Sequence, residues 1–176
     1  MVFSRSPLDE VYSISLEPHV DQRGFFARVF CEREFASYKL ATKYVQWSIS
    51  FNERKGTLRG MHFQLPPQQE TKIVRCTKGS AYDVVLDLRR DSPTYLQWAS
   101  FELTAGNHIS VYVPPGCAHG FQTLEPKTEL FYQISEFYDA VAASGVRWND
   151  PLFGIKWPLP DPILSEQDQF YPDFHL

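Results

Sequence analysis

Several motifs that mark large enzyme classes are missing from this sequence. It contains no G-x-G-x-x-G, no G-x-x-x-x-G-K-[ST], no G-x-S-x-G and no H-E-x-x-H. These patterns indicate dinucleotide sites, phosphate-binding loops, serine hydrolases and zinc proteases, respectively. The sequence therefore lends no support to these four classes of function.

Cysteine is also scarce. The three cysteines, Cys31, Cys76 and Cys117, are widely spaced and form no C-x-x-C pair. An odd number at such spacing argues against both a disulfide framework and a zinc site. We expect three reduced, buried thiols.

Long hydrophobic runs and an excess of positive charge are absent as well. No segment approaches the roughly 18 apolar residues of a membrane helix, and residues 1–9 lack the apolar core of a signal peptide. The net charge of −4 gives no general attraction to nucleic acid. We therefore expect a cytoplasmic protein with neither a membrane nor a nucleic-acid partner, whose anionic ligand is small and held by a local cluster of arginine or lysine.

The chain has enough hydrophobic and aromatic residues to form a core. Of its 176 residues, 43% are hydrophobic and 15% aromatic, which suffices for one domain over residues 1–176. The pattern predicts many short strands without intervening helices, at 11–16, 25–30, 44–50, 58–64, 71–76, 80–87, 97–103, 108–113, 119–123 and 128–134. Short helices are expected at 32–39 and 165–170. This order is typical of an antiparallel sandwich or barrel, and the proline-rich chain after Glu136 is expected to pack on it as a C-terminal strap.

The first unusual segment is 58–64, Leu-Arg-Gly-Met-His-Phe-Gln. A strand would place Met61 and Phe63 on one face and His62 and Gln64 on the other. Lys72 follows on the next predicted strand, so a base and a cation would share one cavity if both polar faces pointed inward. Taken alone, however, His62 and Lys72 are better explained as exposed side chains on the surface of a sheet, because charged residues are mostly exposed.

The second unusual segment is 113–121, where a Pro-Pro-Gly turn leads His119 into a strand. With Lys78-Gly79 it resembles parts of the cupin sequence pattern. Metal-binding cupins present an H-x-H pair with a carboxylate, whereas this chain reads His-Phe-Gln at 62–64, so we expect no metal. Tyr132 shares a predicted strand face with Leu130 and Ile134, and by itself it would pass for a core tyrosine.

Taken together, separated blocks of the chain are similar to the dTDP-4-dehydrorhamnose 3,5-epimerase family, at 21–26, 56–64, 72–75, 82–89, 92–94, 114–121, 148–151 and 163–168. The resemblance implies an all-β double-stranded β-helix, a cupin-like jelly roll with short helices and an irregular strap. It also implies a homodimer in which N-terminal strands extend onto the partner, a nucleotide-sugar substrate and no cofactor.

The family chemistry assigns roles to particular residues. A ketone at C4 of the sugar acidifies the hydrogens at C3 and C5, so inversion needs a base, an acid and a cation near the enolate oxygen. The resemblance implies that His62 is the base, Tyr132 the acid and Lys72 the enolate stabiliser, with Asp168 orienting His62. It also implies substrate contacts for five further residues, namely Arg23 and Arg59 on the diphosphate, His119 beside the sugar, Tyr138 stacked on the nucleobase, and Gln46.

Two positions depart from the family pattern and leave the nucleobase open. Arg28 stands where members acting on thymidine nucleotides usually carry Glu, and Ser48 stands where they carry Asn. The expected reaction converts dTDP-4-dehydro-6-deoxy-D-glucose to dTDP-4-dehydro-L-rhamnose. Inversion of C3 alone or C5 alone, a 3,4-ketoisomerase and a non-catalytic sugar-binding cupin are the alternatives. The combination of base, acid, cation and orienting carboxylate favours an enzyme, because a binding protein has no use for it.

Overall fold

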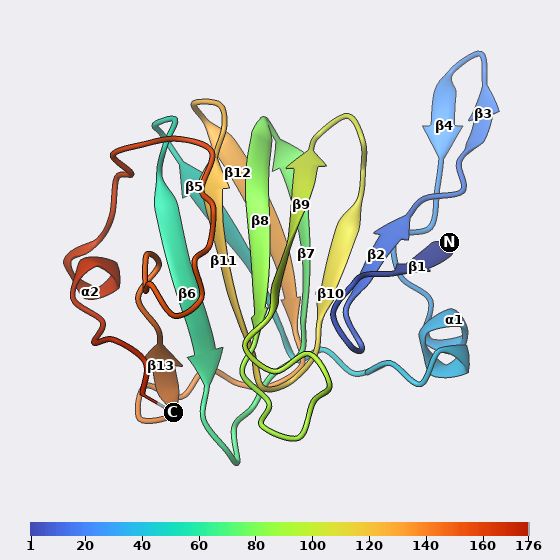
Figure 1. Ribbon diagram of the computed structural model, residues 1–176. Coiled ribbons are helices and arrows are strands. Elements are labelled where there is room, and N and C mark those ends of the chain that lie inside the picture. The colour runs from blue at the N-terminus through green and yellow to red at the C-terminus, as the bar shows by residue number, and fades with distance from the viewer. Residues whose placement is uncertain (176) are drawn as a thin grey trace.

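The computed structural model describes residues 1–175, and it consists of two antiparallel sheets packed face to face with a small hairpin projecting from one side (Figure 1). The six-stranded sheet has the order β1 (Val2–Arg5), β2 (Tyr12–Ser15), β10 (Ser110–Val113), β7 (Lys72–Lys78), β12 (Thr128–Ile134) and β5 (Gln46–Asn52). The five-stranded sheet has the order β13 (Ala143–Gly145), β6 (Leu58–Gln64), β11 (Cys117–Thr123), β8 (Ser80–Asp87) and β9 (Trp98–Thr104). The projecting hairpin is β3 (His19–Asp21) and β4 (Gly24–Phe26).

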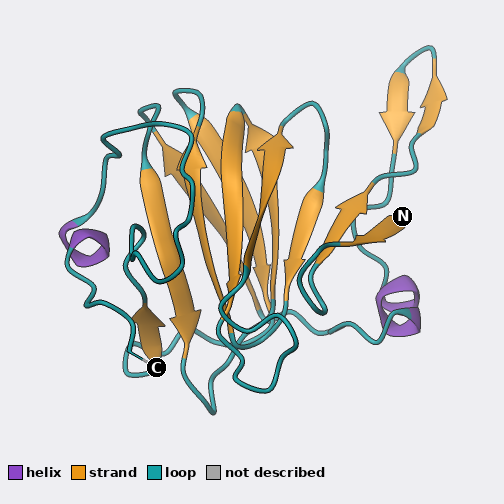
Figure 2. Cartoon of the chain, viewed as in Figure 1, coloured by secondary structure: helices purple, strands orange, loops and turns teal. Residues whose placement is uncertain are grey.

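Strands that neighbour one another in space are often far apart in the chain, as when β11 pairs with both β6 and β8. This interleaving is that of a jelly roll, in which the two sheets share a core. Only two short helices, α1 (Glu32–Ser37) and α2 (Glu166–Gln169), accompany the strands in residues 1–175 (Figure 2). The expected all-β class is confirmed.

The central core lies between the sheets. It is built from alternate positions of facing strands, including Val74, Val85, Leu103, Phe121 and Leu130, all of which are almost completely buried. Each of these strands therefore directs one set of side chains inward, as period-two patterning requires.

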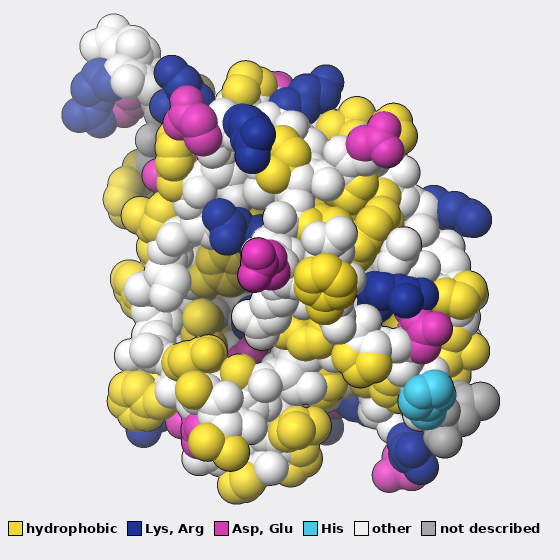
Figure 3. Space-filling view, turned by 90° about the vertical axis from the view of Figure 1, so that its left-hand side faces the viewer, with side chains coloured by type: hydrophobic (Ala, Val, Ile, Leu, Met, Phe, Trp, Pro, Cys, Tyr) yellow, Lys and Arg dark blue, Asp and Glu magenta, His cyan; other side chains and the backbone are white. Residues whose placement is uncertain are grey.

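A second core covers the outer face of the five-stranded sheet. Phe153 and Ile155, from the irregular chain after β13, pack on Met61, Val84 and Leu86 of that face. The C-terminal strap expected from the proline-rich sequence is therefore present and packed. On the face seen in Figure 3, Lys and Arg side chains are dispersed among apolar and acidic ones.

Most predicted strands lie where they were expected, and three have the predicted bounds (58–64, 80–87 and 128–134). The strand predicted at 25–30 is wrong beyond Phe26, where the hairpin partner ends. Phe30 instead packs on Phe35 of α1 and on Tyr44, with ring centroids 4.8 Å and 5.4 Å away. The prediction missed β1, β3 and β13, which have three or four residues each.

The first helix also stops earlier than predicted, at Ser37. Lys39 has a φ of 60°, which ends the helical conformation.

The three thiols are unpaired, and Cys76 and Cys117 are buried. Cys31 is only half-buried, contrary to prediction, because it precedes α1 at the surface. Neither helix of the described chain has the length and apolar character needed to cross a membrane.

Candidate active site

The two sheets supply opposite walls of one pocket. His62, Arg59 and His119 reach it from β6 and β11 of the five-stranded sheet, whereas Lys72 and Tyr132 reach it from β7 and β12 of the six-stranded sheet. This compartment has a volume of about 310 Å³. We call it the inter-sheet pocket. The inward orientation expected for His62 and Lys72 is therefore confirmed, and the alternative of two side chains on an exposed sheet face is wrong.

An irregularity in β6 adds Arg59 to this wall. Strict alternation would place Arg59 and His62 on opposite faces, since they are three positions apart. The pairing with β11 shifts in register, however, so that His62 faces His119 while Arg59 faces Phe121. Gly60 and Gly120 permit the close approach there, because a Cβ at Gly60 would lie 2.5 Å from the Gly120 Cα. Arg59 and His62 thus line one pocket.

His62 has a carboxylate behind it. Its Nε2 lies 2.5 Å from Oδ1 of Asp168, whose side chain is 5% exposed. Asp168 is fixed in turn by α2, since its backbone N–H donates to the Oγ of the N-cap residue Ser165 at 3.1 Å. A carboxylate can only accept, so Nε2 carries a proton, and in the neutral ring Nδ1 has the free lone pair. The expected contact between Asp168 and His62 is confirmed.

Lys72 reaches across the pocket from the opposite wall. Its Nζ lies 2.9 Å from Oε1 of Glu70 and donates to the backbone carbonyl of His62 at 3.2 Å. Both Lys72 and Glu70 are about nine-tenths buried. The cation is thus tied directly to the strand that carries His62.

Tyr132 lies in an apolar and negatively charged setting. Burial raises the pKa of its phenol well above the usual value, and the nearby Asp83 carboxylate raises it further, while Arg59 lowers it. The phenol therefore stays protonated at neutral pH and can donate. Asp83 Oδ2 lies 2.7 Å from His119 Nε2, and the His119 ring meets the ring of Tyr132 edge-on at 5.9 Å.

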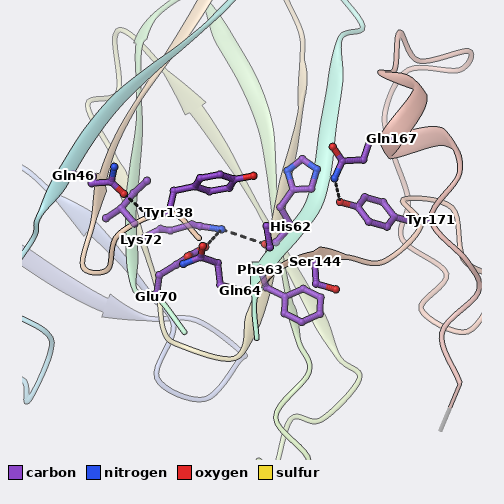
Figure 4. Close-up of a pocket in the computed structure, with 12 residues that line it drawn as sticks. Gln46, His62, Phe63, Gln64, Glu70, Lys72, Tyr138, Ser144, Gln167 and Tyr171 are labelled. Carbon is purple, nitrogen blue, oxygen red and sulfur yellow. Dashed lines mark hydrogen bonds and ion pairs between the residues drawn. The ribbon is translucent and has the colours of Figure 1, made fainter. Parts of the chain in front are cut away.

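A second compartment of about 290 Å³ continues from His62 and Lys72 towards the surface. Figure 4 shows Gln46 and Tyr138 on one side of His62, and Gln167 and Tyr171 of the strap on the other. Gln46 Oε1 accepts a hydrogen bond from the Tyr138 backbone N–H at 2.6 Å, which fixes the loop bearing the exposed Tyr138 ring. The two predicted contacts therefore line the same opening.

Of the five predicted substrate contacts, Arg23 is the one that lines neither compartment. It lies on the turn of the β3–β4 hairpin, which projects from the body of the molecule in Figure 1. Its side chain is 84% exposed and pairs with Asp21 at 2.5 Å. Within one chain, therefore, Arg59 is the arginine that reaches the pocket.

Three residues of the site escaped the reasoning from sequence. Asp83 could have been noticed, because it interrupts the otherwise apolar inward face of Ala81 and Val85. Glu70 stands two positions before Lys72, a spacing that allows contact along an extended chain. Tyr171 offered no such signal, since its place depends on the path of the irregular strap. Among residues 1–175, no group of three or more His, Cys, Asp or Glu side chains could hold a metal ion.

Comparison with known proteins places this arrangement in a family. Residues 5–175 match the family model of dTDP-4-dehydrorhamnose 3,5-epimerase. The chain is 40% identical over 173 residues to such an epimerase from Sinorhizobium fredii, covering 98% of this chain and 89% of the relative.

Solved structures agree with the match. The epimerase structure from Elizabethkingia anophelis has a TM-score of 0.96 at 36% identity, covering 99% of this chain and 96% of that one. The enzyme from Bacillus anthracis, determined with TDP and PPi bound, has a TM-score of 0.94 at 38% identity, covering 98% and 99%. The cupin-like jelly roll predicted from the sequence is confirmed, and the chain belongs to the dTDP-4-dehydrorhamnose 3,5-epimerase family of isomerases.

Proposed function

We propose that the inter-sheet pocket inverts both C3 and C5 of dTDP-4-dehydro-6-deoxy-D-glucose, with His62 as base and Tyr132 as acid. The observation that carries this proposal is the opposition of these two side chains: His62 projects from β6 and Tyr132 from β12, which belong to different sheets but line one cavity. Inversion at carbon requires proton removal on one face and delivery on the other, so reactive groups on facing walls fit the reaction.

Each inversion moves one proton off a carbon and one proton onto it. Nδ1 of His62 takes the proton from the carbon next to the ketone, and the electron pair of that C–H bond moves to the C4 oxygen to give an enolate. The Lys72 ammonium stabilises this negative charge. Tyr132 then delivers its phenolic proton to the opposite face of the carbon, and the electron pair returns to form the new C–H bond. Exchange with water restores both groups before the second centre reacts.

Asp168 supports the base in two ways. It holds the imidazole in the tautomer that leaves Nδ1 free, and its charge stabilises the imidazolium formed after proton removal. Burial of Tyr132 supports its role as acid, since a phenol with a raised pKa keeps the proton that it must donate.

The nucleotide end of the substrate is assigned to the exposed part of the pocket. Tyr138 supplies a 70% exposed aromatic face for a nucleobase, next to Gln46. Arg59 is placed for the diphosphate, with His119 beside the sugar, because both line the same cavity as His62.

We propose further that the protein is a homodimer, in which the projecting hairpin brings Arg23 to the diphosphate in the pocket of the partner. Phe25 and Phe26 of this hairpin are 51% and 76% exposed, and Trp47 and Ile49 on the edge strand β5 are 65% and 62% exposed. Exposed apolar side chains on the hairpin and on the opposite edge strand of the six-stranded sheet favour contacts between subunits. A cytoplasmic location is supported by the unpaired thiols, which are typical of reducing compartments.

The test is incorporation of deuterium from D2O. Incubation with dTDP-4-dehydro-6-deoxy-D-glucose should place deuterium at both C3 and C5, as followed by proton NMR. Parallel reactions with CDP- and GDP-linked 4-keto sugars test the nucleobase. Absence of exchange with all three substrates would reject the proposal, labelling at one carbon would reduce it to a monoepimerase, and a 3-keto product would identify a ketoisomerase.

Two variants separate the roles. His62→Ala should abolish exchange at both carbons. Tyr132→Phe should retain part of the proton wash-out while suppressing inversion, because the base still works and the acid is lost. Equal loss of both processes in Tyr132→Phe would contradict the assignment of base and acid to opposite faces.

A further inference from the structure

Glu70 has no role in the proton transfers described above, yet it makes the shortest contact of Lys72 with a charged group. Its Oε1 lies 2.9 Å from the Lys72 Nζ, and its side chain is only 9% exposed. Figure 4 shows the two side chains next to each other, with Lys72 extending from Glu70 towards His62. A carboxylate removed from water in this way is costly unless it is paired, so the contact with Lys72 is what allows Glu70 to be buried here.

The segment that carries Glu70 is firmly anchored. The backbone N–H of the next residue, Thr71, donates to Ser135 Oγ at 2.8 Å, and Ser135 N–H donates back to the Thr71 carbonyl at 3.0 Å. On the other side, Gln64 Nε2 donates to the Gln68 carbonyl at 2.8 Å. Glu70 is therefore fixed relative to both β6 and β12, the strands of the base and the acid.

The ammonium group has three N–H donors and no acceptor. Two of the donors have partners among the described residues, the Glu70 carboxylate and the His62 carbonyl oxygen at 3.2 Å. When two donors of a tetrahedral nitrogen are fixed, the direction of the third is fixed as well. Since Lys72 lines both compartments, that third donor is available to a ligand oxygen.

We propose that Glu70 is a positioning residue, which orients the Lys72 ammonium so that its third N–H points at the enolate oxygen. This inference rests on the proposed function, in which Lys72 stabilises the enolate. A preorganised donor costs no reorientation when charge develops, so a freely rotating lysine would be a poorer stabiliser.

The experiment compares Glu70→Ala and Glu70→Gln in two backgrounds, the wild type and Lys72→Met. In the wild-type background, Glu70→Ala should lower kcat by about tenfold or more, with KM changed by less than about twofold, because the group it misplaces acts on the transition state. Glu70→Gln keeps an oxygen that accepts from Lys72 and should recover much of the loss. In the Lys72→Met background, Glu70→Ala should cause no further loss.

A matched control is Glu10→Ala. Glu10 is also paired with a cation, Arg89 Nη1 at 2.5 Å, but it does not line either compartment. Its removal should leave kcat unchanged. A Glu70→Ala enzyme with wild-type kcat would overturn the inference, and so would an equal loss in both backgrounds, since Glu70 would then act without Lys72.

A structural readout distinguishes failure of this inference from failure of the proposed function. In a crystal structure of Glu70→Ala, Lys72 Nζ should leave the His62 carbonyl oxygen or occupy several rotamers. Retention of that contact would overturn the inference even in an active enzyme. A wild-type protein that catalyses no exchange would instead reject the proposed function, while a displaced Lys72 in Glu70→Ala would still support the orienting role.

Discussion

The inter-sheet pocket and the end of β8 both contain buried carboxylates, but the hydrogen bonding of these carboxylates differs. At the end of β8, Asp87 is completely buried and its acceptor oxygens are used many times over: Oδ1 accepts from the Arg89 backbone and side chain, and Oδ2 accepts from Arg89, Ser92 and Thr94. At the pocket, the Asp168 carboxylate is hydrogen-bonded to His62, and Asp83 Oδ1 is buried without a hydrogen-bond partner in the described chain.

This difference separates stability from chemistry. A carboxylate surrounded by donors is locked in one state, and it stabilises the fold around it. A carboxylate paired with one histidine can respond when that histidine gains a proton. The carboxylate whose acceptor oxygens are all used therefore lies outside the pocket. The groups inside the pocket can still change their protonation state.

The largest effect should follow from Asp168→Asn. The amide no longer enforces the tautomer of His62 or stabilises the imidazolium, so kcat should fall by about 10³-fold. Stability should change much less, because an amide of similar size still fills the site. Deuterium exchange and a thermal melt on the same sample measure the two quantities. A large loss of stability with little loss of kcat would contradict this prediction, because Asp168 would then serve the stability of the fold rather than the chemistry.

Asp87→Asn should show the opposite behaviour. It removes charge-assisted hydrogen bonds to a partly buried arginine, so the free energy of unfolding should fall by about 3 kcal/mol. Denaturant titration measures that loss, and kcat per folded molecule should remain that of the wild type. If kcat falls with stability, the network at β8 also shapes the pocket.

The same network predicts a dependence of stability on pH. Burial alone would raise the pKa of Asp87, but the hydrogen bonds from Arg89, Ser92 and Thr94 outweigh it and lower the pKa from 3.8 to about 2. A depressed carboxyl pKa stabilises the fold above the unfolded value, and this contribution is lost as pH falls through the folded value. About 2 kcal/mol should therefore disappear between pH 4 and pH 2.

Denaturant midpoints of wild type and Asp87→Asn, measured across that range, test this linkage. The gap between the two proteins should narrow as the pH falls, because the wild type loses a charge that the variant never had. A gap that stays constant down to pH 2 would show that Asp87 does not titrate there.

The smallest effect is expected from Gly145→Ala. A Cβ at this position would lie 2.4 Å from Cζ of Tyr171 on the strap, so the strap must shift, at a cost of about 1 kcal/mol. Because the strap also carries Asp168, kcat should fall severalfold. Gly106→Ala is the control, since its nearest contact is at 3.9 Å. Equal behaviour of the two variants would show that the strap tolerates displacement.

The sequence predicts this fold well wherever apolar and polar residues alternate along a strand. The strands at 80–87 and 128–134 pair with two neighbours along nearly their whole length, and the strand at 58–64 pairs first with β11 and then with β13. Strands β1, β3 and β13 are too short for such a pattern and depend on their partners. The place of Arg59 could not be foreseen either, because it depends on a register shift between β6 and β11.

For the site, family motifs identified the residues that form the pocket and the contact between His62 and Asp168, but not the other contacts. His62, Lys72 and Tyr132 lie together as expected, while Glu70 and Asp83 emerged from distances that only the folded chain defines. Arg23 shows the converse limit. Its motif predicts a substrate contact, and within a single chain nothing brings the hairpin to the pocket.

The pairing of His62 with Asp168 also has a consequence for the order in which the enzyme is made. The two residues are 106 positions apart in the chain. A ribosome that has synthesised both sheets through β12 has therefore produced the histidine but not its carboxylate. Under the proposed mechanism, a nascent protein that has folded its core still lacks the carboxylate that orients the base, so full activity would require the strap to be translated and docked.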